Sequence, residues 1–264
     1  MADLLLLVRV SFRQALKTRV FWLVFLGAAI LAGADLANRE FFRVATAAGE
    51  WERVAEIRVK GASQALELWG SATVLIGLVL GATAIGADRR SGVLELLLTR
   101  PIDRRRYLLG RWLGLELFLL VFLSVVFAVS LLALRLPALH PTPVFWLGLA
   151  EIVVQVTLVT ALGFAFGTVL RPVPAAIWSV LLVSLPSLGA SLAARTDGWV
   201  HALGAVLYLL GPAEMQENLL RAGLTEDALA PEYGLKILVL IENLLYAAMA
   251  LALSGVVFRR RDPL

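Results

Sequence analysis

The sequence predicts an all-α integral membrane protein with six transmembrane helices, and three observations carry this prediction. Apolar residues make up 60% of the 264 residues and charged residues only 17%, whereas about a quarter of the residues in a soluble domain are charged. Long apolar segments recur along the chain, and Lys and Arg concentrate in some of the segments that join them. We therefore treat residues 1–264 as a single transmembrane domain.

The chain begins with an amphipathic segment that precedes the first span. Helical spacing places Arg9, Arg13 and Lys17 on a basic face and Leu5, Val8, Phe12 and Leu16 on an apolar face. A helix with two such faces lies in the plane of the membrane interface. The sequence thus predicts that this N-terminal helix contacts lipid.

Six segments are long enough, or nearly so, to cross the hydrocarbon, which takes about 20 apolar residues. They are residues 20–37, 68–87, 112–134, 144–170, 172–194 and 236–258. A shorter apolar run, Ala202–Leu210, ends at Gly-Pro and cannot span, so it predicts an interfacial or re-entrant helix. Residues 38–66 carry mixed charge at helical spacing and predict a short surface helix.

The fifth span holds Pro172, Pro174 and Pro186 together with several small residues. Irregular backbone at membrane depth is tolerated where it is buried in protein or lines a cavity. This composition predicts the least regular helix of the six. The span either moves or contacts substrate, or it packs on a neighbour through its small side chains.

The basic residues indicate the orientation. With both termini in the cytoplasm, the inner segments hold 15 Lys and Arg residues and the outer segments hold 9. Cytoplasmic segments near span ends are enriched in these residues. The sequence predicts a multi-pass protein of the inner (cytoplasmic) membrane with both termini cytoplasmic. Its pI of about 9.8 then reflects cytoplasmic loops and anionic lipid, and we expect no nucleic-acid partner.

Residues 88–111 form the only sizeable cytoplasmic loop and contain seven arginines. Ser91 can cap a short helix, Gly92–Thr99, which Arg100-Pro101 ends because a residue before proline disfavours the helical conformation. Leu94, Leu97 and Leu98 share one face of that helix. Asp103 caps the next helix, which continues into the third span. The apolar face lies on lipid or docks a soluble partner.

Ionisable side chains within spans are costly and often functional. Glu116 lies one turn from Arg111, which predicts a structural ion pair. Glu151 and Glu242 approach the outer end, where they either line an outer vestibule shared between subunits, for a cationic substrate or a metal, or have no role in transport. Their spacing with His140 and His201 does not predict a metal site.

A membrane hydrolase is the weakest alternative. Ser191 and His201 are the residues that it would use, but serine in a transmembrane helix more often bonds its own backbone. We predict no catalytic residue in this chain.

The stretch RRSGVLELLLTRPIDRRRYLLGRWLG, residues 89–114, resembles the signature loop of ABC-2 type permeases, the membrane halves of many ABC exporters. The resemblance extends along the chain through the amphipathic start, the six spans and the partial helix before the last span. Residues 38–66 also resemble the subgroup that includes the nitrous-oxide reductase (multi-copper enzyme) maturation permease.

The resemblance implies that the loop between spans two and three is a coupling helix seated on an ATP-binding subunit. The matching positions are Ser91, Gly92, Val93, Leu94, Glu95, Leu96 and Leu97. It implies that the N-terminal helix is an elbow helix, with Arg9, Phe12, Arg13, Leu16 and Lys17 against the ATPase or lipid.

The resemblance further implies a homodimer with two ATPase subunits, which would bind ATP and Mg. This chain has no Gly-Lys pair and hence no P-loop of its own, so we expect no cofactor in it. A protein partner on the outer side is also an expectation. A channel or secondary transporter, or a membrane scaffold, remains the alternative class.

Overall fold

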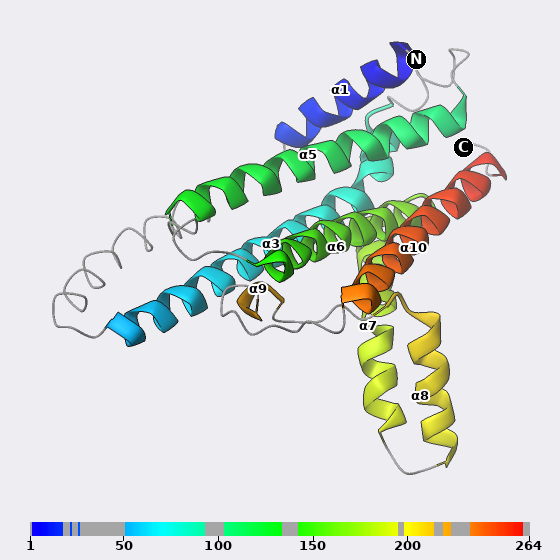
Figure 1. The fold of residues 1–264 in the computed structure, drawn as a ribbon. Helices are drawn as coiled ribbons and strands as arrows, with labels where there is room; N and C mark the ends of the chain where they lie inside the picture. The colour runs from blue at the N-terminus through cyan, green and yellow to red at the C-terminus, as the bar shows by residue number, and fades with distance from the viewer. Residues whose placement is uncertain are drawn as a thin grey trace.

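The computed structural model describes residues 2–17, 51–92, 103–133, 142–194, 198–213, 219–222 and 233–260, together with Trp22 and Leu26. Within these residues all regular structure is helical, which confirms the predicted all-α class. Figure 1 shows the helices as an elongated bundle from which one helical hairpin projects.

Five of the described helices are long and apolar enough to cross a membrane. They are α3 (Trp51–Arg90, apolar from Ser63), α5 (Arg104–Ala133), α6 (Pro143–Gly167), α7 (Pro172–Ala193) and α10 (Tyr233–Arg260). They cover the predicted second to sixth spans. The predicted first span, 20–37, lies outside the described residues except for Trp22 and Leu26, so the count of six remains a prediction.

Helix α3 is longer than predicted. It runs without a break for 40 residues, which at 1.5 Å per residue is about 60 Å, or twice the hydrocarbon thickness. The surface helix predicted within 38–66 is therefore not separate, because from Trp51 onward it continues directly into the span. Residues 51–67 contain no proline, and the helix continues through their single glycine, Gly61.

The core lies where α3, α5 and α6 meet. Half or more of each of these apolar segments is buried, against 22% of α7 and of α10. Phe118 and Leu119 of α5 and Ile76 of α3 belong to this core, as does Phe164 of α6. The short helix α9 (Leu219–Ala222) covers one flank of α6, where Leu220 packs against Gly148.

Glycines bring α3 and α6 into backbone contact. A Cβ on Gly81 would lie 2.7 Å from the carbonyl oxygen of Thr160, and one on Gly167 would lie 2.7 Å from that of Ala82. Gly77 and Gly81 are four residues apart on α3, as are Gly163 and Gly167 on α6. This spacing of small residues lets membrane helices approach closely. We call this contact the glycine seam.

Helices α7 and α8 (Gly198–Leu210) form the projecting hairpin (Figure 1). Its two helices also touch through backbone, because Gly189 faces Gly204. Helix α8 has 13 residues, about 20 Å, so the prediction that this run is too short to span is confirmed.

The prolines of the predicted fifth span do not interrupt its helix, and whether it is the least regular of the spans stays a prediction. Helix α7 is continuous from Pro172 to Ala193. Pro172 and Pro174 lie in its first turn, where the missing N–H is not needed. Only Pro186 lies in the interior, packed against Gly211 beyond the end of α8.

Candidate functional site

The described residues define both ends of the loop that the sequence singled out. Helix α3 ends at Arg90, where the Ser91 N–H donates to the Ala87 carbonyl at 3.0 Å and the Gly92 N–H to that of Arg89 at 3.3 Å. Gly92 has a φ of 69°, a left-handed conformation that costs glycine little. The chain therefore leaves α3 in a set direction.

The other end of the loop is set by Asp103. Its Oδ1 accepts the Arg105 N–H at 3.2 Å, and its carbonyl accepts the Tyr107 N–H at 3.0 Å. An aspartate at this position satisfies a backbone N–H that the helix itself cannot. The prediction that Asp103 caps the helix of the third span is confirmed.

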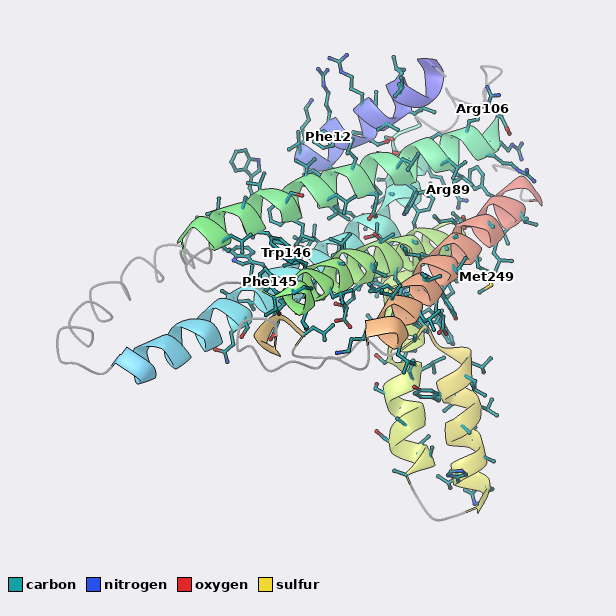
Figure 2. All side chains as sticks on the ribbon, viewed as in Figure 1. Phe12, Arg89, Arg106, Phe145, Trp146 and Met249 are labelled. Atoms are coloured by element: carbon teal, nitrogen blue, oxygen red, sulfur yellow. The ribbon has the colours of Figure 1, made fainter. Side chains whose placement is uncertain are left out.

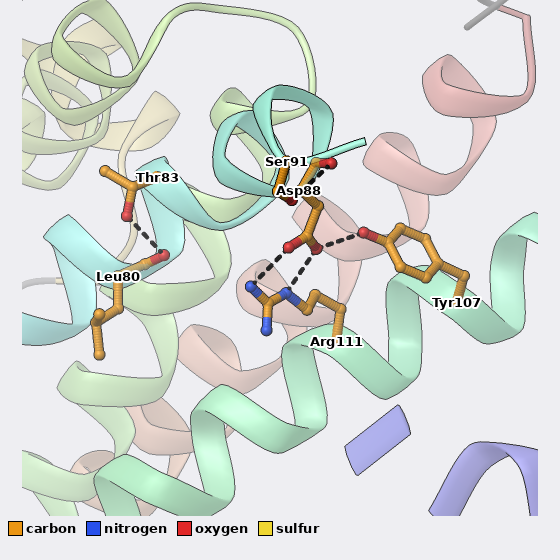
Figure 3. Close-up of polar contacts among 6 residues, drawn as sticks. All are labelled: Leu80, Thr83, Asp88, Ser91, Tyr107 and Arg111. Atoms are coloured by element: carbon orange, nitrogen blue, oxygen red, sulfur yellow. Dashed lines mark hydrogen bonds and ion pairs between the residues drawn. The ribbon is translucent and has the colours of Figure 1, made fainter. Parts of the chain in front are cut away.

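A buried polar cluster joins the two ends (Figure 3). Arg111 of α5 lies with Nε 2.9 Å from Asp88 Oδ2 and donates from Nη2 to Oδ1 at 3.1 Å. Tyr107 donates its hydroxyl to Asp88 Oδ2 at 2.5 Å. Asp88 is 4% exposed and Arg111 7%. We call Asp88, Tyr107 and Arg111 the Asp88 cluster.

Two further contacts tie the Asp88 cluster to α6 and α10. The Tyr107 ring stacks on Phe258 near the end of α10, with ring centroids 6.3 Å apart. Arg89, next to Asp88, donates from Nη2 to the Thr168 carbonyl just beyond α6 at 3.2 Å. Four helix ends therefore meet beside the loop.

Of the predicted coupling residues, Ser91 and Gly92 lie in the turn that ends α3. The Ser91 hydroxyl donates to the Asp88 carbonyl at 3.2 Å, which joins it to the end of α3. Val93, Leu94, Glu95, Leu96 and Leu97 lie outside the described residues, as does the predicted helix from residue 93 onward.

The N-terminal helix α1 (Ala2–Leu16) packs lengthwise on α5 (Figures 1 and 2). The Phe12 ring lies edge-on to Phe118, with centroids 5.9 Å apart. Ser11 packs directly on Gly114, where any side chain would clash with it. Arg9, Arg13 and Lys17 are exposed, as the basic face predicts.

The face of α1 that packs on α5 is not centred on the predicted apolar face, whose contact with lipid stays a prediction. The residues that α1 buries are Leu7, Ser11 and Ala15, whereas Leu5 and Leu16 are exposed. The buried face is centred on small residues because α5 approaches closely at Gly114. A count of apolar residues overlooks a face of this kind.

The predicted pairing of Glu116 with Arg111 is wrong. Arg111 binds Asp88 instead, and Glu116 Oε1 accepts the Thr157 hydroxyl of α6 at 2.6 Å. Glu116 is 5% exposed, and its Oε2 has no hydrogen-bond partner. Side chains five residues apart on a helix point about 140° apart, so Glu116 and Arg111 face different neighbours.

The two carboxylates predicted to line an outer vestibule lie on different helices. Glu151 of α6 is half-buried and Glu242 of α10 is exposed. Nowhere in the described part of the chain do three His, Cys, Asp or Glu residues gather as a metal site would require. A shared vestibule stays a prediction.

Ser191 and His201 do not form a catalytic pair in this structure. The Ser191 hydroxyl donates to the Ser187 carbonyl one turn back at 2.8 Å, which confirms the predicted backbone bond. His201 Nδ1 lies 2.6 Å from the Ala193 carbonyl oxygen. The Ser191 bond therefore stays within α7, whereas the His201 contact joins α8 to α7.

Sequence reasoning missed the Asp88 cluster and the glycine seam. The seam was legible as Gly-x-x-x-Gly in two spans. Asp88 carried a weaker signal, a single acidic residue at the end of a span and directly before two arginines. Its partner Arg111 is 23 residues away on another helix, and helical periodicity predicts contacts only within one helix.

The family model described as ABC-2 family transporter protein matches residues 5–263, nearly the whole chain. No curated protein matches the chain.

Proposed function

Because the chain belongs to the ABC-2 family of transporter proteins, and so is a membrane component of an ABC transporter, we propose that it couples ATP hydrolysis in a separate subunit to export of a substrate. The ATPase would dock on residues 91–97. ATP and Mg would be bound by that subunit, since this sequence has no P-loop.

The anchoring of the loop is the observation that supports this function best. Both ends of the 93–102 segment are set by backbone hydrogen bonds, and the Asp88 cluster joins them. A docking segment transmits force only if its attachments to the spans do not yield. A helix that merely lay on lipid would not require a buried ion pair beneath it.

We propose the assembly that the family implies, two copies of this chain with two ATPase subunits in the inner membrane and both termini cytoplasmic. The weakly buried helices α7 and α10 leave apolar surface for a second copy and for lipid. The exposed Arg9, Arg13 and Lys17 suit a surface of anionic headgroups or an acidic patch of the ATPase.

The narrower subgroup predicts a second role, signalling to a metalloenzyme on the outer side. The length of α3, about 60 Å over 40 residues, supports an outer partner, because residues 51–62 extend beyond the apolar segment that begins at Ser63. Figure 1 shows its first turns beyond the rest of the described bundle, at the end opposite the loop. The test is whether an outer protein is recovered with the detergent-extracted complex and is lost when residues 38–55 are replaced.

The function is tested by purifying the tagged protein from its own cells in mild detergent. We expect a stoichiometric ATP-binding protein and ATP hydrolysis with the wild type. Leu94→Arg should lose both, because it puts a charge on the proposed docking face. Leu94→Met keeps that face apolar and is the matched control. Wild-type protein without a nucleotide-binding partner would favour the channel or scaffold class.

A further inference from the structure

We propose that Asp88, Tyr107 and Arg111 are positioning residues that make α3 and α5 move as one body when the loop between them is displaced. The proposal rests on the function proposed above. It assigns to these residues the conversion of a push on the loop into a movement of the spans.

The first argument is the geometry of the ion pair. Two nitrogens of the planar Arg111 guanidinium face the two oxygens of the Asp88 carboxylate, at 2.9 and 3.1 Å. The Nη2 contact is a hydrogen bond, and the Nε contact is an ion pair without a hydrogen bond of its own. The carboxylate is thus contacted at both oxygens, which restricts its rotation as well as its distance from Arg111. A lysine would supply the charge but not the two-point contact.

The second argument is that stability alone does not account for the cluster. Burying an ion pair costs desolvation that the attraction between the charges often does not exceed, and apolar residues of similar volume can be equally or more stable. Asp88 and Arg111 are both more than nine-tenths buried. What a buried pair adds over an apolar contact is a single allowed alignment of the two helices.

The third argument concerns Tyr107, which lies one turn before Arg111 on α5 and therefore on the same face. Its hydroxyl binds the same carboxylate, so Asp88 is held from two successive turns of α5. Two attachments along the axis resist tilting of α5 against α3, which a single attachment would permit. The ring of Tyr107 also stacks on Phe258, which adds the end of α10.

The fourth argument is that α3 is joined to α6. Arg89 binds the Thr168 carbonyl at the end of α6, and the glycine seam puts the backbone of residues 77–82 against that of residues 160–167. Interfaces packed this closely do not deform continuously. A displacement of the Asp88 cluster is therefore transmitted through α6 to α7, which follows it after four residues.

The experiment uses the complex of this chain with its ATPase in lipid nanodiscs. The chain has no cysteine, so Gly198→Cys on α8 and Leu235→Cys on α10 can carry two spin labels. The distance between the labels is measured without nucleotide and with ATP trapped by vanadate. ATPase occupancy of each sample is measured by gel densitometry, which separates docking from movement.

Asp88→Asn and Arg111→Lys should retain the ATPase and lose at least half of the ATP-induced distance change. Tyr107→Phe removes one hydroxyl and should reduce the change less. Arg105→Ala, an exposed arginine in the first turn of α5, is the matched control and should respond as the wild type does. Since lysine keeps the charge, loss in Arg111→Lys identifies the two-point contact as the cause.

A wild-type distance change in both Asp88→Asn and Arg111→Lys, at full ATPase occupancy, would overturn the proposal. If Asp88→Asn does not fold, Arg111→Lys and Tyr107→Phe decide in its place. A wild-type preparation without any ATPase would be a different result. It would refute the proposed function, and therefore also the positioning role, before any variant is compared.

Discussion

For buried polar side chains of this protein, the direction in which a side chain points on its helix decides its partner, and nearness in sequence does not. Arg111 binds Asp88, 23 residues away, and not Glu116, five residues away. Asn243 of α10 donates to the carbonyl of Ala213 at 3.1 Å, in non-helical backbone beyond α8. The hydrogen bond joins two segments that lie 30 residues apart in sequence.

Glu116→Gln should raise thermal stability. The amide oxygen can still accept from Thr157. The amide nitrogen takes the place of the unpaired Oε2, but a neutral amide costs less to bury than a carboxylate. We expect a gain of about 1 kcal/mol, or about 2–4 °C in Tm for a chain of this size. Tryptophan fluorescence during heating in detergent measures it.

Glu116→Ala is the comparison for that variant, because it removes the carboxyl but also leaves a cavity, and it should lower the Tm. A lower Tm for Glu116→Gln as well would mean that the carboxyl has a partner outside the described residues.

At the scale of elements, close backbone contact and not side-chain volume decides which helices form pairs. Helices α3 and α6 meet through Gly77, Gly81, Gly163 and Gly167. Apolar side chains give no preference between helices in a bilayer, since lipid is equally apolar. Small residues at a spacing of four provide that preference.

Gly81→Ala should destabilise the protein by about 1–3 kcal/mol. Its Cβ would lie 2.7 Å from the Thr160 oxygen and 3.0 Å from the Phe164 nitrogen, and both are backbone atoms that cannot rotate away. The measurement is the Tm in detergent. Gly255→Ala on α10 is the control, because its Cβ meets nothing within 4 Å. That variant should be neutral or gain about 0.5–1 kcal/mol from helix propensity.

Asn243→Ala should loosen the hairpin of α7 and α8 from α10. It leaves the Ala213 carbonyl without its donor, at a cost of about 1–3 kcal/mol. Hydrogen exchange of residues 198–213 should rise while that of α3 stays unchanged. Leu244→Ala, at a half-exposed position of α10, should leave both unchanged. An unaltered exchange rate in Asn243→Ala would mean that the bond from Tyr246 to the Leu210 carbonyl holds the hairpin alone.

At the scale of the whole molecule, the buried and exposed helices have separate places. Helices α1, α3, α5 and α6 share the main core, whereas α7 and α8 contact the rest mainly near the base of their hairpin (Figure 1). The Asp88 cluster lies at one end of that core and the tip of the hairpin is remote from it. The movement that we propose for the Asp88 cluster would therefore enter the protein through its main core and not through the hairpin.

The predicted orientation can be read with single cysteines, since the chain has none of its own. Gly198→Cys lies at the exposed start of α8, and Ser91→Cys at the exposed end of α3. In intact spheroplasts a membrane-impermeant maleimide should label the first at least tenfold faster than the second. After permeabilisation both should react, and the reverse order in intact cells would place the termini outside.

The sequence alone determined the membrane class, five of the helices and the residues by which the chain resembles its family. These properties depend on local features of the sequence, namely the length of an apolar run, the capping of α5 by Asp103 and the motif in residues 89–114. Local sequence features did not determine three other properties. These are the face of α1 that packs on α5, the pairing of Arg111 with Asp88 and the continuity of α3 through residues 51–62. The tertiary structure decided them, because each depends on which backbone approaches which, and a Gly or Ser that permits such an approach carries no apolar signal of its own.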